Sequence, residues 1–244
     1  MNKFNKTLFI MLSLLLTNCY EIDGSSDISS EMIYSPSIEE SNSDTSIDSE
    51  TSTEESNSSE SSSSSEEDMY VSFTKPIKLY VNPSVQYSNL YASSLGNEGQ
   101  YMNKISNILV DMLTTYTNLI VYANNSLPGK SLSSSVSESN SLNVDYHLSL
   151  HSNAGGGKGS EGWYSSTSYN FTKSIIDSLQ EVLPYPTRGL KYGQSNLYEL
   201  KRTNASACLI EILFHDDEKQ ALFIINNQYE IAKAIFNGIV SYFK

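Results

Sequence analysis

Cysteine, tryptophan, histidine and basic residues are all scarce in this chain of 244 residues. It has two cysteines, one tryptophan and three histidines, and 15 Lys and Arg stand against 28 Asp and Glu. Two cysteines exclude a disulfide-rich scaffold. The net charge of −13 arises in one region, because residues 20–70 hold fifteen acidic residues and no basic one. Residues 71–244 carry thirteen charges of each sign, so a basic nucleic-acid-binding surface is also excluded.

The N-terminus has an apolar run, at residues 8–16, that is about half as long as the ~20 residues of a membrane-spanning helix. It follows Lys3 and Lys6, which is typical of a signal peptide at residues 1–19. The segment Leu16-Thr17-Asn18-Cys19 resembles a bacterial lipobox, although Asn18 replaces the usual small residue. We therefore predict an extracytoplasmic protein of the cell envelope, anchored to the membrane through a lipid on Cys19. Plain secretion and a retained anchor are the alternatives.

Residues 20–70 lack the large apolar side chains that a core requires. Nearly half of residues 25–65 are serine, and most others are acidic, Thr or Asn. Burial cannot offset chain entropy in such a segment, so we predict a disordered, acidic, Ser-rich linker. Residues 71–244 are enough for one domain of ordinary size.

Apolar periodicity in 71–244 alternates between strands and helices. Strands are predicted at 77–81, 119–122, 146–151, from 162, and in the apolar run 207–214; helices are predicted at 98–115, 132–142, 171–182 and 225–243. This order predicts a three-layer α/β/α domain with a mostly parallel mixed sheet. Cys208 lies in the last apolar run and is interpreted as a core residue.

Three polar side chains stand at element ends where such folds collect their chemistry. Glu98 begins a helix, His151 ends a strand, and Glu211 interrupts an apolar run. Each also has a structural interpretation: Glu98 as a helix N-terminal acid, His151 as a hydrogen-bonded strand end, and Glu211 as a paired core acid. Together they favour a zinc-water site with two ligands and one base.

Several short blocks resemble the zinc-dependent N-acetylmuramoyl-L-alanine amidases. The run from Tyr146 to Ala154, with Ser-Leu-His-Ser-Asn-Ala inside it, is similar to the family's zinc-binding strand motif. Asn97-Glu98 matches the place of its ligand Glu, and residues 207–214 resemble the block that carries its catalytic Glu. The run 188–191 also matches a similar run of the family.

The resemblance implies a peptidoglycan hydrolase that cuts the amide between N-acetylmuramic acid and L-alanine, acts as a monomer and uses Zn²⁺. His151 and Glu98 would bind zinc and Glu211 would be the acid and base. Ser152 and Asn153 would support His151, and Lys191 would lie near the site or the substrate.

The first strand departs from the family. Asn82-Pro83-Ser84-Val85 stands where the family usually has Asp-Pro-Gly-His, whose His is a zinc ligand. Gln86 is the nearest replacement, but an amide oxygen is a weak zinc ligand. The alternative hypothesis is therefore a lapsed amidase that binds peptidoglycan without cutting it.

Two other histidines and a glycine-rich run are further candidates for the site. His147 lies about 13 Å along the strand from His151, too far to share one ion. His215 is interpreted as a solvent-facing loop residue, with an approach to the site as the alternative. Residues 154–160 lack the Gly-Lys-Ser/Thr end of a phosphate loop and are interpreted as a flexible loop beside the site.

Overall fold

A computed structural model of the protein describes residues 75–116 and 118–244. Its elements are β1 (Ile77–Pro83), the 3-10 helix η2 (Ala92–Ser94), α2 (Glu98–Leu113), β2 (Leu119–Ala123), α3 (Leu132–Ser141), β3 (Tyr146–Asn153), β4 (Glu161–Tyr164), α4 (Tyr169–Gln180), β5 (Leu190–Tyr192), α5 (Tyr198–Arg202), β6 (Ser206–Phe214), α6 (Glu218–Asn226) and α7 (Gln228–Phe243). The predicted signal peptide at 1–19, with Cys19, and the predicted linker at 20–70 lie outside the described residues.

The sheet has six strands in the order β2-β1-β3-β6-β4-β5. β2, β1, β3 and β6 run parallel, β4 is antiparallel to β6, and β5 is parallel to β4. The predicted mostly parallel mixed sheet is confirmed. Because β1, β3 and β6 are adjacent and parallel, their carboxyl ends meet at one edge of the sheet.

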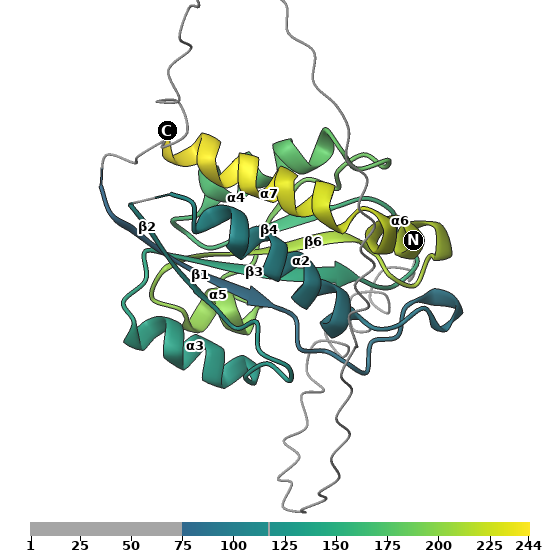
Figure 1. Ribbon diagram of the computed structural model, residues 1–244, viewed down its shortest axis with the longest axis horizontal. Helices are drawn as coiled ribbons and strands as arrows, with labels where there is room; N and C mark the ends of the chain where they lie inside the picture. The colour runs from purple at the N-terminus through teal and green to yellow at the C-terminus, as the bar shows by residue number, and fades with distance from the viewer. Residues whose placement is uncertain (1–74, 117) are drawn as a thin grey trace, which may run out of the picture. The chain divides into compact units, whose positions relative to one another are not determined.

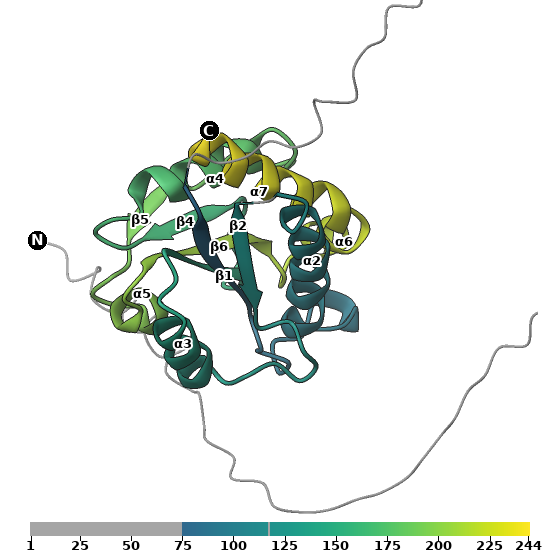
Figure 2. The same ribbon diagram turned by 60° about the vertical axis from the view of Figure 1, so that its left-hand side comes forward.

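Helices cover both faces of this sheet (Figures 1 and 2). α2, α4 and α7 lie on one face, and α3 and α5 lie on the other. Successive strand residues point to opposite faces. In β3, Leu148 and Leu150 therefore join the main core beneath α2, α4 and α7, whereas His147 contacts α3 and α5 through Ser139 and Glu199. The second face is more polar, and it carries the candidate site.

The main core forms as the periodicity predicts. Fully buried side chains from α2, α4 and α7, including Met102, Ile175 and Ile235, pack on the apolar side of the sheet. Gly238 lets α7 approach α4 closely, because a Cβ there would lie 2.6 Å from the Cα of Ile175. Cys208 is fully buried in β6, as predicted.

The prediction of a single closing helix at 225–243 is wrong in one respect, because the structure has two helices there, α6 and α7. The backbone of Asn227 has φ −123° and ψ 31°, outside the helical region, and its side-chain amide donates to the carbonyl of Phe223 at 2.8 Å. Asp217 begins α6 by accepting from the backbone N–H of Gln220 at 3.0 Å, an N-cap bond. The short elements β5 and α5 were not predicted either, since three and five residues are too few to show a period.

No helix in the described ranges is long and apolar enough to span a membrane.

Candidate active site

A row of three polar residues crosses the sheet on the face of α3 and α5. In the strand register, His151 of β3 is opposite Glu211 of β6, and Glu211 is opposite Glu161 of β4. Neighbouring strands lie about 4.8 Å apart, so the row spans about 10 Å. Two of these residues are predicted site residues, and Glu161 is an addition that the sequence analysis missed.

Glu98 reaches this row from the first turn of α2. Asn97 caps the helix by accepting from the backbone N–H of Gln100 at 2.9 Å, which leaves the carboxylate of Glu98 free to turn inward. Its Oε1 lies 2.9 Å from Nδ1 of His151, and the residue is only 1% exposed. Glu98 therefore meets His151 although 53 positions separate them in the chain.

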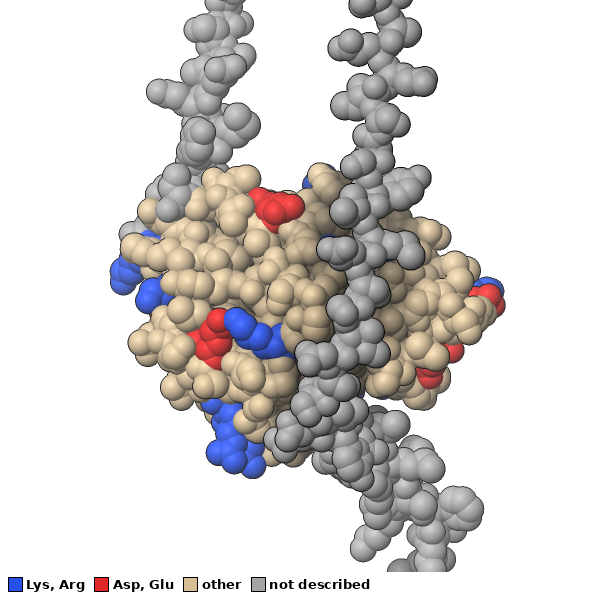
Figure 3. All heavy atoms as spheres, turned by 60° about the horizontal axis from the view of Figure 1, so that its bottom comes forward, with Lys and Arg blue, Asp and Glu red and all other residues tan. Residues whose placement is uncertain are grey.

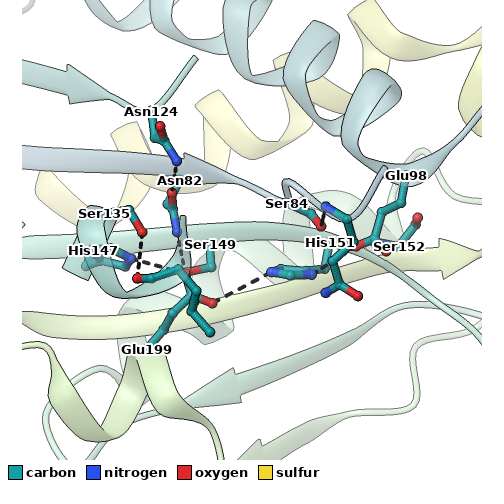
Figure 4. A network of polar contacts seen from close by, with 12 residues as sticks. Asn82, Ser84, Glu98, Asn124, Ser135, His147, Ser149, His151, Ser152 and Glu199 are labelled. Atoms are coloured by element: carbon teal, nitrogen blue, oxygen red, sulfur yellow. Dashed lines mark hydrogen bonds and ion pairs between the residues drawn. The ribbon is translucent and has the colours of Figure 1, made fainter. Parts of the chain in front are cut away.

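A second carboxylate holds the other side of the His151 ring (Figure 4). Glu199 of α5 lies 3.7 Å through its Oε2 from Nε2 of His151. Its Oε1 accepts from the hydroxyl of Ser149 at 2.6 Å and from the amide of Asn82. Glu199 was not among the site residues predicted from the sequence. In the sequence it is a single acidic residue near an apolar strand, with no other predicted site residue close to it, so no local pattern identified it.

The other two histidines do not contact His151. His147 is fully buried, with its Nδ1 2.9 Å from the hydroxyl of Ser139 and its ring stacked on Tyr80. The interpretation of His215 as solvent-facing is wrong. It is 4% exposed, stacks on Tyr91, and places Nδ1 2.9 Å from the carbonyl of Ser152. Its backbone is bonded to η2 and β3: the N–H of Ala92 donates to the carbonyl of His215, and the N–H of His215 donates to the carbonyl of Asn153, each at 2.8 Å.

Gln86 lies near Glu98 through one shared partner. The side-chain amide of Asn89 donates both to Oε1 of Gln86 and to Oε2 of Glu98, each at 2.7 Å. Val85, at the place of the family's usual ligand, offers no donor atom. The structure therefore brings the predicted Gln86 toward Glu98 but interposes Asn89, which sequence reasoning did not consider.

The remaining predicted residues lie around the row and, among the described residues, form no hydrogen bond with the ring of His151. The backbone N–H of Ser152 donates to Oε1 of Glu98 at 3.4 Å. Asn153 donates to Oε1 of Glu161 at 3.2 Å, and Nζ of Lys191 lies 2.6 Å from Oε2 of Glu161. Their contacts thus reach the two carboxylates at either end of the site.

Contacts within the site move the pKa values in opposite directions. Burial lowers the pKa of His151, but the bonds with Glu199 and Glu98 outweigh it and place that pKa well above its usual value. Burial raises the pKa of Glu98, but His151 and Asn89 together hold it below its usual range. The pKa of Glu199 is lowered by the same kind of pairing, against its burial. The two carboxylates on either side of its ring therefore favour the protonated form of His151.

Glu211 behaves differently because it has no such partner. Burial, chiefly, raises the pKa of Glu211 to about 8, while the charge of His151 lowers it and those of Glu98 and Glu161 raise it. The residue is partly exposed, but its Oε2 atom is buried and has no hydrogen-bond partner among the described residues. A carboxyl group with a pKa near neutrality can both take and give a proton, as a general acid and base must.

This raised pKa predicts a pH-dependent stability of the metal-free chain. Glu211 binds its proton more tightly in the folded state, so the free energy of unfolding should fall between pH ~4.5 and ~8 and level off above. The upper limit is about 5 kcal/mol, and partial exposure reduces it. Glu211→Gln should remove this contribution, which urea unfolding at several pH values measures. His151 adds its own fall above pH ~6.5 in both proteins, so the difference between them isolates Glu211; parallel curves would contradict the assignment.

The glycine run at 154–160, which was predicted to be a flexible loop, makes four hydrogen bonds to the side chains of Asp216 and Gln220. Backbone N–H groups of Gly155 and Gly156 donate to Oδ2 of Asp216 at 2.7 and 2.9 Å. The side chain of Gln220 bonds both the N–H of Gly159 and the carbonyl of Gly157, at 3.1 and 3.0 Å. Positive φ at three of these glycines allows the backbone to turn toward α6.

Two of the residues present, His151 and Glu98, are of the types that bind zinc in proteins. In the part of the chain that the structure describes, no three His, Cys, Asp or Glu side chains group closely enough to hold a metal. The 2.9 Å between Nδ1 of His151 and Oε1 of Glu98 is nevertheless near the roughly 3.3 Å that separates two ligands of one tetrahedral zinc. The unpartnered buried oxygen of Glu211 is a further sign that the site is built for a polar occupant.

Most of the face that Figure 3 turns forward is uncharged, and the Lys and Arg side chains on it lie mainly at the left of the view, one of them beside an acidic side chain. This agrees with the equal numbers of acidic and basic residues in 71–244.

Comparison with known proteins places these features in a family. A family model described as N-acetylmuramoyl-L-alanine amidase matches residues 89–241, a range that begins just after Gln86. The N-acetylmuramoyl-L-alanine amidase CwlM of Bacillus licheniformis is 27% identical over 176 residues, which cover 68% of this chain and 69% of that protein.

Solved structures share the fold. An N-acetylmuramoyl-L-alanine amidase from Clostridium difficile 630 has a TM-score of 0.62 at 19% identity, over 69% of this chain and 97% of that one. The catalytic domain of CwlV, an N-acetylmuramoyl-L-alanine amidase from Bacillus (Paenibacillus) polymyxa, has a TM-score of 0.63 at 19% identity, over 68% and 97%. With the family model matching more than half of its length, this chain belongs to the type 3 N-acetylmuramoyl-L-alanine amidase family.

Proposed function

We propose that the protein hydrolyses the amide bond between N-acetylmuramic acid and L-alanine in peptidoglycan. The observation that carries this is the meeting of Glu98, His151 and Glu211 at one edge of the sheet, with a buried oxygen of Glu211 left unpartnered. Family membership supports the same reaction. Family membership alone would not be sufficient support, because proteins that share a fold can differ in activity.

Zn²⁺ is the cofactor that we propose. His151 and Glu98 would hold it, and Gln86 is the weaker third candidate because Asn89 already shares its amide with Gln86 and Glu98. A bound zinc would polarise the scissile carbonyl and make water a better nucleophile. Glu199 would keep the ring of His151 turned toward Glu98, as carboxylates behind ligand histidines commonly do.

Glu211 is the residue that we assign to proton transfer. Its carboxylate takes a proton from the attacking water, holds it, and delivers it to the nitrogen of the leaving L-alanyl amine. A pKa of about 8 favours the protonated form that the second step requires. The charges of neighbouring residues already raise and lower the pKa of Glu211. A bound metal or substrate would bring further charges and dipoles and would shift this pKa again.

Two measurements on the full chain test this function. Purified protein should contain about one zinc per chain, and intact sacculi should release new muramyl and L-alanyl ends when it is added. Binding of sacculi without any cleavage, under every metal supplement, would replace the hydrolase by the lapsed binding protein that the missing first-strand histidine suggests.

We also propose that Cys19 carries a lipid and that residues 20–70 serve as a tether to the membrane. The support is the apolar run before Cys19 and the acidic, Ser-rich composition after it. Several acyl chains hold a protein firmly on a bilayer, whereas one holds it marginally. Cys19→Ala should therefore move the protein from the membrane fraction to the soluble fraction. Unchanged fractionation, with no lipid label on the wild type, would leave secretion or a retained anchor.

A further inference from the structure

At the β4 end of the row, the carboxylate of Glu161 is surrounded by four polar side chains. Its Oε2 lies 2.7 Å from Nε of Arg188 and 2.6 Å from Nζ of Lys191. Its Oε1 accepts from Asn153 and from the indole of Trp163, each at 3.2 Å. The proton-transfer scheme uses none of these contacts.

The cluster leaves one positive charge uncompensated at the surface. Glu161 is 4% exposed, whereas the side chains of Arg188 and Lys191 are 41% and 34% exposed. Arg188 bonds Glu161 only through Nε, and its two Nη atoms have no partner among the described residues. The charged groups lie over aromatic rings: the guanidinium carbon of Arg188 is 5.1 Å from the ring centroid of Phe214, and Nζ of Lys191 is 5.0 Å from that of Trp163.

Stability alone does not account for this arrangement. Half-exposed ion pairs contribute little to folding, and burying Glu161 removes its hydration. What the buried carboxylate does achieve is to fix two cations with free N–H groups on the outer side. The planar guanidinium of Arg188, with both Nη atoms free, matches the two oxygens of a carboxylate.

The position of the cluster relates it to the scissile bond. Glu161 is opposite Glu211, which is opposite His151, so Glu161 lies about two strand spacings, roughly 10 Å, from His151. An extended peptide advances about 3.3–3.6 Å per residue. A peptide that leaves the amide at His151 and crosses β6 and β4 would reach the cations with its second or third residue.

We propose that Arg188 and Lys191 form a subsite for a carboxylate of the stem peptide, two or three residues beyond the amide that is cut. This rests on the proposed function, because that function places the scissile amide at His151 and Glu211. The subsite selects acidic stem peptides over those in which the same carboxylate is amidated.

The test compares two synthetic muramyl peptides that differ only in that group, a free carboxylate in one and a carboxamide in the other. The full chain should cleave the acidic peptide with the higher kcat/KM. Lys191→Met and Arg188→Gln should each lower that value by about 10- to 100-fold, the loss of one charge-assisted hydrogen bond, while changing cleavage of the amidated peptide little. Lys191→Arg should retain much of the preference.

Lys201→Met and Arg202→Gln are matched controls. They remove the same two charges from the exposed end of α5, where neither side chain has a partner among the described residues, and should leave the preference unchanged. Binding of both peptides is also measured with Glu211→Gln protein, which separates recognition from cleavage.

The outcomes distinguish the subsite from the reaction. Cleavage of both peptides at equal kcat/KM, or a preference that survives loss of both cations, overturns the subsite and leaves the hydrolase standing. Binding of the acidic peptide that Lys191→Met weakens, without any cleavage, supports the subsite and removes the hydrolase. No binding and no cleavage of either peptide overturns both.

Discussion

Glu211→Gln is expected to lower the rate of amide cleavage by about 10²- to 10⁴-fold, the usual contribution of a general acid and base. Glutamine keeps the size of the side chain but cannot carry the proton. Zinc content and sacculus binding should stay at the wild-type level, because Glu98 and His151 contact each other and not the carboxylate of Glu211. Release of L-alanyl ends and zinc analysis of the same sample measure the two properties together.

A matched variant shows whether the loss is specific to the site. Glu181→Gln removes a carboxylate from the exposed C-terminal end of α4 and should leave cleavage unchanged. A Glu211→Gln protein that cleaves at the wild-type rate would remove Glu211 from the mechanism. Loss of zinc together with cleavage would instead assign Glu211 to the metal.

His151→Ala is expected to abolish both zinc binding and cleavage. It removes the imidazole that contacts Glu98, and the loss of zinc affinity should exceed the ~10- to 100-fold typical of losing a residue behind a ligand. It also leaves Glu98 and Glu199 without their shared partner, at a cost of about 3–5 kcal/mol in stability. Competition with a metal indicator measures zinc affinity, and thermal unfolding checks that the chain is folded.

Two further variants interpret that result. His147→Gln removes an imidazole from the same strand but one that faces Ser139, so zinc should be retained. Gln86→Ala should weaken zinc binding less than His151→Ala does, since an amide oxygen is a poor ligand. Unchanged affinity in Gln86→Ala would exclude Gln86 as a ligand, and normal zinc binding in folded His151→Ala would refute the proposed site.

Short-range patterns in the sequence determined the fold class and the strands that carry the site. Period 2 in 146–151 and period 3.6 in 98–115 define β3 and α2, because each pattern reports which side of a local element is apolar. A polar residue that ends or interrupts such a pattern stands out, which is why the sequence alone predicts His151, Glu98 and Glu211 as site residues.

Only the tertiary structure decided what surrounds those three residues. Glu199 reaches His151 across 48 positions of the chain, Arg188 meets Glu161 across 27, and His215 is buried by contact with Ser152, 63 positions earlier. None of these pairings leaves a periodic trace, because each depends on which strand is placed beside which in the sheet. Burial of a single acid or histidine is settled by the partner that another element brings to it, and an isolated residue in the sequence does not carry that information.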